Sequence, residues 1–524
     1  MNLIYRLTSS AVVLVLLPLF SFSQYGVPDA GFGINGVALA DVSGFTDDIT
    51  SVIVQQDGQI VMSGSAQYTD PDGGTSVLIP IVCRFSATGE ADTAFNAIML
   101  TELTAPTFAN SYFTDVLQDA SGKLLFFGSR KSDFFIVRVL QDGTIDDNFA
   151  DNGKSVIDLN GTYDLAHGFI QQSDEKLVAV GQTLVGNLLK PVILRFLSDG
   201  TLDPSFGTSS GYTVIPNIAN FGNFIDVIQQ PADGKYVAAG YYMDPVTDLN
   251  WFYLARFNND GIIDSTFDND GIVTMDFGPG TNQFLTKIAL QEDGKILATG
   301  KVYTLSSSAC VARFKADGSL DDGFQGGGKQ MLNWGVTSSS ATSVMLQTDG
   351  KIVLSGYASN LTSDESFVMM RMLDNGAPDN TFGTNGITEN NFGFNAAIAT
   401  CSAIQPDGKL LAAGYNGEDA MVARYSGLFI GINSPATTGF SCNVFPNPVT
   451  DAAFLTFNMN TAATVEVSLC DATGKKLATL FGDHLAKGKQ QLNLPVPSGI
   501  SGGFYFCRVQ AGAEQAVIPL QILR

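Results

Sequence analysis

Two short stretches of the sequence fit motifs that carry chemistry in other proteins. GFGING at 31–36 fits G-x-G-x-x-G, a turn that holds a dinucleotide pyrophosphate, and GTSSG at 207–211 fits G-x-S-x-G, which presents a nucleophilic serine. Both motifs need a strand before them and a helix after them, but here each lies in a turn of a β-rich repeat. Only His167 and His484 could act as a base for Ser209. We therefore predict no catalytic residue and no cofactor.

Acidic side chains offer two other kinds of chemistry. Two carboxylates about 5 to 10 Å apart can hydrolyse a glycosidic bond, and Asp70, Asp244 or Asp248 could supply them in a hydrolase, the enzyme alternative for this chain. The acidic stretches YTDPDGG and FDNDG could bind calcium, but neither supplies a complete EF-hand loop. We predict no metal site from them.

These residues lie in a repeated sequence. LQEDGKILATG at 290–300 returns as LQTDGKIVLSG at 346–356, and a fixed period of this kind indicates stacked supersecondary units. Asp-Gly between two β-rich runs predicts a hairpin, because glycine tolerates the positive φ of a tight turn. The seven copies have a mean spacing of about 58 residues and end at Gly64, Gly128, Gly181, Gly240, Gly300, Gly356 and Gly414.

Each copy continues with a third run that contains an arginine, and all but the last then have a turn of the form G-x-x-D-x-x-F and a fourth run such as GIVTMDF. Such a unit is a four-stranded antiparallel meander with the size of a propeller blade. We expect the turn phenylalanines to pack between blades; they are Phe32, Phe95, Phe149, Phe206, Phe267, Phe324 and Phe382. The expected structural ion pairs are Arg84 with Asp92, Arg138 with Asp146, Arg195 with Asp203, Arg256 with Asp264, Arg313 with Asp321, Arg371 with Asp379, and Arg424 with Asp29.

The two ends of the repeat region complement each other. The seventh copy stops after its third run, AMVARYSG, whereas GVPDAGF and GVALADV near the amino end supply the missing turn and fourth run. A ring of seven blades closed by an N-terminal outer strand uses both fragments and removes two exposed sheet edges. The predicted fold is therefore an all-β, seven-bladed propeller of four-stranded antiparallel blades.

The repeat resembles the delta-60 repeat, a bacterial β-propeller family whose biochemical role is undefined. The resemblance rests on Q-x-D-G-K, the arginine strand and D-G-x-x-D-x-x-F-G-x-x-G, and it extends over about residues 25–426. The copies depart from the pattern at few places: Thr88 replaces the turn aspartate in the first, and Asp174-Glu175 replaces Asp-Gly in the third. These changes affect local turns and leave the fold expectation unchanged.

Beyond residue 432 the period ends. NSPATTG at 433–439 is typical of a linker, and the short β-rich runs of 440–524 predict a small Ig-like β-sandwich. This segment resembles the C-terminal sorting domain of the type IX secretion system, through Pro-Asn-Pro at 446–448, D-x-x-G-K at 471–475, Gly488 and G-x-Y at 503–505. The resemblance implies the type IX machinery as a partner and transport across the outer membrane.

The amino end and the composition agree with export. Residues 1–23 have one arginine, a short apolar run and small residues, which predicts a signal peptide and a propeller domain over 24–432. A net charge of −23 argues against nucleic acid as a partner. Cysteine spacing leaves the disulfide pairing open, with Cys470 and Cys507 as the first pair to test; the others are Cys83, Cys310, Cys401 and Cys442.

The variable loops should lie on one face of the ring, opposite the repeated hairpin turns. Aromatic residues in or beside them could bind a sugar or a protein; they are Tyr68, Tyr241, Tyr242, Trp251, Tyr303, Tyr357 and Tyr415. We therefore expect a monomeric, exported cell-surface or secreted propeller that acts as a binding or display module, with a glycan or a protein as its ligand. The alternatives are the carboxylate-dependent hydrolase, with its site at the mouth of the ring, and a passive structural component of the envelope.

Overall fold

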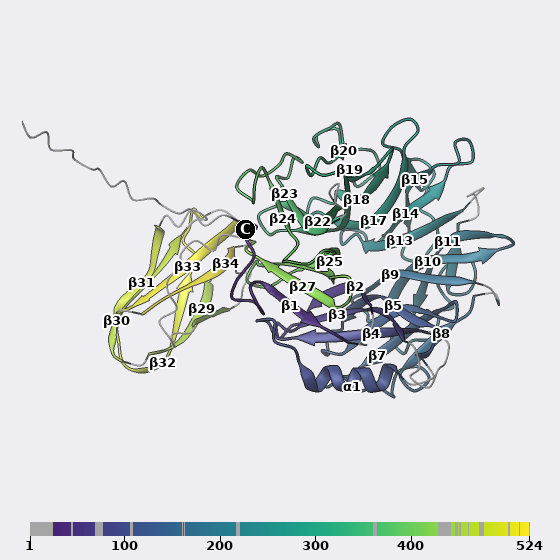
Figure 1. The fold of residues 1–524 in the computed structure, drawn as a ribbon. Helices are drawn as coiled ribbons and strands as arrows, with labels where there is room; N and C mark the ends of the chain where they lie inside the picture. The colour runs from purple at the N-terminus through teal and green to yellow at the C-terminus, as the bar shows by residue number, and fades with distance from the viewer. Residues whose placement is uncertain are drawn as a thin grey trace, which may run out of the picture.

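The computed structural model describes residues 25–427 except 43–45, 69–76, 105–107, 160, 162, 216–220 and 360–363. It also describes 442–522 except 446–448, 450–451, 460, 471–475, 501–502 and 513. The fold is all-β apart from one helix of more than two turns (Figure 1). The predicted signal peptide, the linker at 433–439 and the Pro-Asn-Pro and D-x-x-G-K motifs lie outside the described residues.

Seven antiparallel sheets, numbered here as blades 1 to 7, occupy residues 37–425 of the described chain. Blade 1 contains β2 (Asp47–Val54), β3 (Ile60–Tyr68) and β4 (Val77–Phe85); blade 2 contains β5 (Ser111–Gln118), β6 (Leu124–Arg130), β7 (Asp133–Val139) and β8 (Lys154–Ile157); blade 3 contains β9 (Asp164–Gln171), β10 (Leu177–Val185), β11 (Leu188–Phe196) and β12 (Tyr212–Val214). Blade 4 contains β13 (Gly222–Gln229), β14 (Tyr236–Met243), β15 (Asn250–Phe257) and β16 (Ile272–Met275); blade 5 contains β17 (Asn282–Leu290), β18 (Ile296–Tyr303), β19 (Ser307–Phe314) and β20 (Lys329–Met331). Blade 6 contains β21 (Ser338–Leu346), β22 (Ile352–Ser359), β23 (Glu365–Met372) and β24 (Ile387–Asn390); blade 7 contains β25 (Ile398–Ile404), β26 (Leu410–Tyr415), β27 (Ala420–Tyr425) and β1 (Val37–Ala40).

The N-terminal strand β1 closes the ring. It pairs antiparallel with β27 over four residues, from Val37 opposite Ala423 to Ala40 opposite Ala420. The first strand of each blade contacts the first strand of the next, and β25 of blade 7 contacts β2 of blade 1. The purple strand β1 accordingly lies beside the light-green β27 in Figure 1. Both fragments of the incomplete seventh repeat are thus used in one sheet.

The first strand of every blade has a β-bulge opposite the glycine that ends its copy of the repeated stretch. These seven residues, from Gly64 to Gly414, are called the phrase-ending glycines below. In blade 5 the register shifts between Leu285 and Lys287, directly opposite Gly300. A Cβ atom on Gly300 would lie 2.1 Å from the carbonyl oxygen of Phe284, and at the other six phrase-ending glycines the corresponding distance is 1.8 to 2.2 Å. The bulge brings two backbones so close that only glycine fits, which explains why the repeat keeps this residue.

Substitution of this glycine should destabilise the propeller. Gly300→Ala would place a methyl group within contact of backbone that cannot move aside, and we expect a loss of about 2 to 3 kcal/mol in the free energy of unfolding. Gly482→Ala is the control, because a Cβ atom there meets nothing within 4 Å. Urea unfolding of both variants checks the difference. Equal stability of the two would contradict the explanation.

Blade 1 departs from the predicted four-stranded pattern. After β4 the chain forms helix α1 (Thr93–Leu103), and the sheet holds three strands among the described residues. Asp92 caps the helix by accepting a hydrogen bond from the Phe95 amide. In five other repeats the residue after the turn phenylalanine is in the left-handed region, as at Gly207 and Gly383. The first repeat has Asn96 and Ala97 there, so the helix continues and buries Met99.

The C-terminal segment forms a separate pair of sheets. One contains β28 (Cys442–Phe445), β29 (Ala452–Met459) and β32 (Gly488–Pro495), and the other contains β31 (Lys476–Leu485), β30 (Ala463–Cys470), β33 (Gly503–Ala511) and β34 (Glu514–Ile522). Buried side chains from both sheets, such as Leu455 and Val467, share one core. This arrangement is a small β-sandwich.

Candidate functional site

The repeated arginines, aspartates and phenylalanines form seven equivalent clusters. In each, the arginine lies 2.7 to 3.0 Å from the aspartate carboxylate. The guanidinium carbon also lies 3.8 to 4.8 Å from the centroid of the repeat phenylalanine. The closing pair, Arg424 with Asp29, joins residues from opposite ends of the ring region at 3.0 Å. These clusters stabilise the turns that connect the third strand of a blade to its outer, fourth strand.

The arginines also connect neighbouring blades, which sequence reasoning did not anticipate. Arg371 Nη1 donates to the carbonyl oxygen of Gly427 in the next blade at 2.7 Å. The other six make the same kind of bond; their acceptors are Gln141 for Arg84, Ser198 for Arg138, Asn259 for Arg195, Ala316 for Arg256, Asp374 for Arg313 and Ala87 for Arg424. The last of these bonds links blade 7 to blade 1. Each arginine is therefore both a turn anchor and an interblade clamp.

Hydrogen bonds and neighbouring charges lower the pKa of six of the seven cluster aspartates; they are Asp29, Asp92, Asp146, Asp203, Asp264 and Asp379. At Asp203, burial alone would raise the pKa, but the Ser205 hydrogen bonds and the charges of Arg195 and Lys176 outweigh it and bring the pKa to about 2. Burial is likewise outweighed at Asp29, whose pKa is lowered by Lys409, the Gly31 amide and Arg424. Lys409 and Lys176 are the lysines of the repeated Q-x-D-G-K and S-D-E-K turns. Carboxylates held in this way are structural groups.

The bulges of the first strands surround the central channel with hydroxyl groups. Thr286 Oγ1 donates to the carbonyl oxygen of Ala341 in the next blade at 2.7 Å, and Thr342 does so to Ala399 at 2.9 Å. The Thr50 hydroxyl donates to the Phe113 carbonyl at 2.9 Å. The Thr400 hydroxyl donates to the Ile49 carbonyl, across the closure between blades 7 and 1. Threonine at the bulge therefore ties adjacent blades together at the inner edge.

A cavity of about 400 Å³ lies within this ring, and its lining includes the charged side chains of Asp115 and Lys287. Asp226 is buried and binds Lys287 Nζ at 3.1 Å and the Ile288 amide at 3.0 Å. Asp115 accepts hydrogen bonds from Ser51 at 2.7 Å and from the Val116 amide. Burial raises the pKa of Asp115, and Lys287 opposes that effect. The carboxylates bond to groups of adjacent blades, so they too support the ring.

His167 takes the bulge position in blade 3 and lines the same cavity. Its Nε2 is buried without a hydrogen-bond partner, and burial lowers its pKa from 6.5 to about 4. Since the unfolded chain then binds more protons between these values, the free energy of unfolding should fall as pH drops from 6.5 to 4. The part due to His167 is up to about 3 kcal/mol.

The variant His167→Thr isolates this effect, because it restores the residue found at the bulge in five blades. Its hydroxyl should donate to the Phe224 carbonyl of blade 4, by analogy with Thr286. We expect the difference in stability between the variant and the natural chain to grow in favour of the variant between pH 6.5 and 4. Chemical denaturation at several pH values measures it. A difference that stays constant with pH would show that His167 is not the titrating group.

Aromatic residues of four adjacent blades lie at the end of the blades away from the Asp-Gly hairpins. The aromatic arc comprises Tyr241, Phe284, Tyr303, Tyr357 and Tyr415, from blades 4 to 7. Tyr241 contacts Phe284 with ring centroids 5.0 Å apart, and Phe284 contacts Tyr303 at 5.9 Å. Lys301 lies over both Phe284 and Tyr303.

The arc continues into blades 6 and 7 and ends beside two carboxylates. Burial and the nearby Tyr303 raise the pKa of Tyr357, and burial together with Asp48 and Glu365 raises that of Tyr415 to about 12. Tyr303 is 41% exposed, Asp48 is exposed, and the other arc residues are half-buried. The arc thus presents accessible rings with hydroxyl groups and carboxylates alongside.

The remaining predicted aromatics lie elsewhere or outside the described side chains. Tyr242 packs edge-on to Trp251 at 6.3 Å and against Tyr253 at 5.5 Å, since strand alternation directs it to the side opposite Tyr241. Tyr68 ends β3, and its side chain is outside the described part. The aromatic arc therefore does not include Tyr68, Tyr242 or Trp251. It includes Phe284, which the sequence analysis did not predict.

Two of the acidic residues of the hydrolase alternative, Asp244 and Asp248, lie in one turn, where the Asp248 amide donates to the Asp244 carbonyl at 2.9 Å. Asp244 caps its own loop by accepting hydrogen bonds from the amides of Val246 and Thr247, and the Thr247 hydroxyl lowers its pKa. Asp248 lies at a turn with φ of 54°, and Asp70 is outside the described residues. Cys470 and Cys507, on the adjacent strands β30 and β33, are free thiols, as are Cys83, Cys310 and Cys401.

Comparison with known families defines both parts of the chain. Four segments match the model described as "Domain of unknown function (DUF5122) beta-propeller"; they are residues 172–206, 232–267, 291–324 and 347–382. Residues 443–522 match "Secretion system C-terminal sorting domain". The chain therefore carries β-propeller repeats of the first type and a C-terminal sorting domain of the type IX secretion system. No curated protein matches the chain.

The solved structures that this chain matches share little sequence with it. Sqt1 from Chaetomium thermophilum is 12% identical, with 74% of this chain and 100% of that chain covered and a TM-score of 0.41. A polysaccharide lyase of family PL25, an ulvan lyase, is 11% identical, with 74% and 96% covered and a TM-score of 0.40. A protein of unknown function from Dyadobacter fermentans DSM 18053 is 10% identical, with 75% and 100% covered and a TM-score of 0.39.

The sorting domain implies export through the type IX machinery to the cell surface or beyond. In the part of the chain that the structure describes, no helix has the length and apolar character needed to cross a membrane.

Proposed function

We propose that the exported propeller binds a neutral polysaccharide through the aromatic arc. The observation that supports this proposal is the presence of aromatic rings at the same end of four adjacent blades, with rings in contact from Tyr241 through Phe284 to Tyr303. Rigid rings offer flat apolar surface at little entropic cost, and their hydroxyl groups remain available for hydrogen bonds. A sugar ring has matching faces of C–H groups and a rim of hydroxyls.

The charge of the site favours a neutral ligand. Asp48 and Glu365 lie beside Tyr415 and can accept hydrogen bonds from sugar hydroxyls. Lys301 is the cation in direct contact with arc rings. A chain with a net charge of −23 repels polyanions, so sulfated or uronic-acid-rich polymers should bind more weakly than neutral glucans, mannans or xylans.

The test is affinity electrophoresis of the mature full-length chain in gels that contain individual polysaccharides. We expect retardation by at least one neutral polymer, and a loss of affinity of about 10-fold or more in Tyr357→Ala/Tyr415→Ala, because each stacking contact contributes about 1 kcal/mol. Tyr415→Phe should keep most of the affinity. Tyr163→Ala is the matched control, since Tyr163 is 46% exposed but outside the arc.

Different outcomes separate this proposal from others. Retardation that is unchanged in the double variant would exclude the arc as the binding surface. Binding to protein components of an envelope fraction, with no polysaccharide bound, would assign the arc to a protein partner instead.

A hydrolase is the second candidate, and the channel carboxylates favour it. Asp115 lines the cavity beside Lys287, the ion-pair partner of Asp226, and the charge of Asp226 contributes to raising the pKa of Asp115, after the larger effect of burial. A raised pKa suits a general acid. Reducing-sugar release from bound polymers, abolished in Asp115→Asn, would support it; binding without release would leave the binding function alone.

A further inference from the structure

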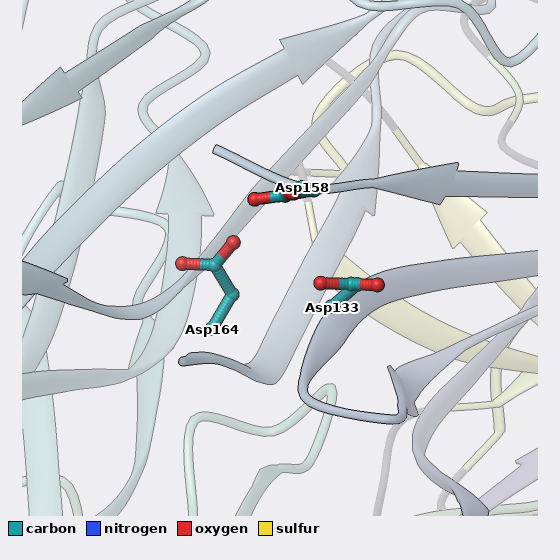
Figure 2. A group of neighbouring side chains, drawn as sticks. All are labelled: Asp133, Asp158 and Asp164. Atoms are coloured by element: carbon teal, nitrogen blue, oxygen red, sulfur yellow. The ribbon is translucent and has the colours of Figure 1, made fainter. Parts of the chain in front are cut away.

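Three aspartates from three different elements converge at the seam between blades 2 and 3. Asp133 begins β7, Asp158 follows β8, and Asp164 begins β9. One carboxylate oxygen from each lies within 4.8 Å of the others, which is unique to this group in the described part of the chain. Figure 2 shows the three carboxylates around a common space. They are separated by up to 31 residues in sequence, so no local sequence motif predicts the group.

Asp164 is the most buried of the three aspartates, and one of its carboxylate oxygens is available to bind a cation. Asp164 is 0% exposed; its Oδ2 accepts the Leu159 amide at 2.9 Å, whereas Oδ1 is buried without a hydrogen bond of normal geometry. Burial raises the pKa of Asp164, and the charges of Asp158 and Asp133 add to that effect, although the Leu159 amide and the Thr183 hydroxyl oppose it. An ionised carboxylate buried in this way needs a partner.

Protein cations do not supply that partner. Among the described residues, neither Asp133 nor Asp164 forms an ion pair with a lysine or an arginine. Arg130 is near enough to lower the pKa of Asp133, but burial and the charge of Asp158 outweigh it and the pKa is raised. Asp133 and Asp164 therefore lie beside each other and beside Asp158 without a paired cation of their own, and a bound cation would reduce the repulsion within the group.

We propose that Asp133, Asp158 and Asp164 bind one Ca²⁺ ion. Oxygen ligands are those that hard cations prefer, and Ca²⁺ binds six to eight of them at about 2.3 to 2.6 Å. Two oxygens on one Ca²⁺ therefore lie no more than about 5 Å apart, which agrees with the 4.8 Å limit of this group. Mg²⁺ needs oxygens at about 2.0 to 2.1 Å and would require the carboxylates to draw closer together.

The ion would brace the loops of the variable face. The Asp164 amide already donates to the Ser132 carbonyl at 2.7 Å and so joins blade 3 to the loop before β7. A cation shared by the three carboxylates would add the segment after β8 to this junction. The site lies on blades 2 and 3, whereas the aromatic arc lies on blades 4 to 7, so the proposal does not depend on glycan binding.

The test uses the mature full-length chain after chelator treatment and dialysis. Isothermal titration with CaCl₂ should show one site with a Kd of about 10⁻⁴ M or tighter, in the range of extracellular calcium modules. Calcium at 100 times Kd should then raise the melting temperature by several degrees, and MgCl₂ at the same concentration should raise it much less. No saturable heat and no calcium-specific shift would overturn the proposal.

Matched variants distinguish this site from nonspecific binding to an acidic protein. Asp158→Asn should weaken binding about 10-fold or more, and Asp133→Asn/Asp158→Asn should abolish the saturable heat. Asp268→Asn is the control: Asp268 also has a pKa raised by burial and by Asp270, but FDNDG forms no such three-carboxylate group. Its φ of 46° suits asparagine. An equal loss of binding in the control, or full binding in the double variant, would refute the assignment.

Discussion

Removal of residues 25–40 from the mature chain is expected to abolish cooperative folding of the propeller. The segment contributes β1, the fully buried Phe32 and the Asp29 partner of Arg424. Without this segment, β27 would become an exposed sheet edge. Arg424 would lose its carboxylate partner and keep its interblade bond to the Ala87 carbonyl. The combined cost approaches the total stability of an ordinary domain, about 5 to 15 kcal/mol.

Circular dichroism and light scattering measure this result. The truncated chain should lose its sharp thermal transition and form dimers or aggregates through the exposed edge, and a synthetic peptide of residues 25–42 should restore part of the transition when added in trans. A truncated monomer that melts at the temperature of the intact chain would rule out the closing role of β1.

Substitution of Arg371 by methionine should produce the largest effect of any single replacement in the repeat clusters. Arg371 is 1% exposed, bonds Asp379 at 2.9 Å and the Gly427 carbonyl at 2.7 Å, and lies over Phe382 and Tyr25. Methionine keeps the length of the side chain but leaves the buried Asp379 unpaired. We expect a loss of about 3 to 5 kcal/mol.

A double-mutant comparison gives this prediction its control. Arg371→Met/Asp379→Leu removes both charges and should recover part of the loss, because no unpaired carboxylate remains. Lys315→Met should change stability by less than about 1 kcal/mol, since its pair with Asp322 is exposed at both ends. If Arg371→Met were as mild as Lys315→Met in urea unfolding, the clusters would not hold the blades together.

The fold was largely predictable because its determinants recur in register. The repeated arginine, aspartate and phenylalanine fixed the outer turn of each blade, and the missing turn of the last repeat identified GVPDAGF as its complement. Helix α1 was missed, because the replacement of the glycine turn by Asn96 and Ala97 is a local change inside a regular pattern. The arginine clamps were missed because they join turns about 60 residues apart.

The candidate site was only partly predictable. Tyr241, Tyr357 and Tyr415 directly follow the phrase-ending glycine, so the repeat itself placed them at equivalent positions. Strand alternation separated Tyr242 from them, and Phe284 joined them through a contact between blades that no sequence spacing reveals. The Asp133, Asp158 and Asp164 group likewise depends on three loops meeting in space.

The most direct test of the account is a disulfide across the closure of the ring. Leu39 lies opposite Met421 in the β1–β27 pair, and opposite residues of antiparallel strands are about 4.5 to 5.5 Å apart at Cα, within the range for a disulfide. We predict that Leu39→Cys/Met421→Cys oxidises within one chain, seen as a single cross-linked peptide pair by mass spectrometry. Leu39→Cys/Val368→Cys, which moves the second thiol one blade back, should not. Free thiols in the first variant, or cross-links only between chains, would contradict a ring closed by its own N-terminal strand.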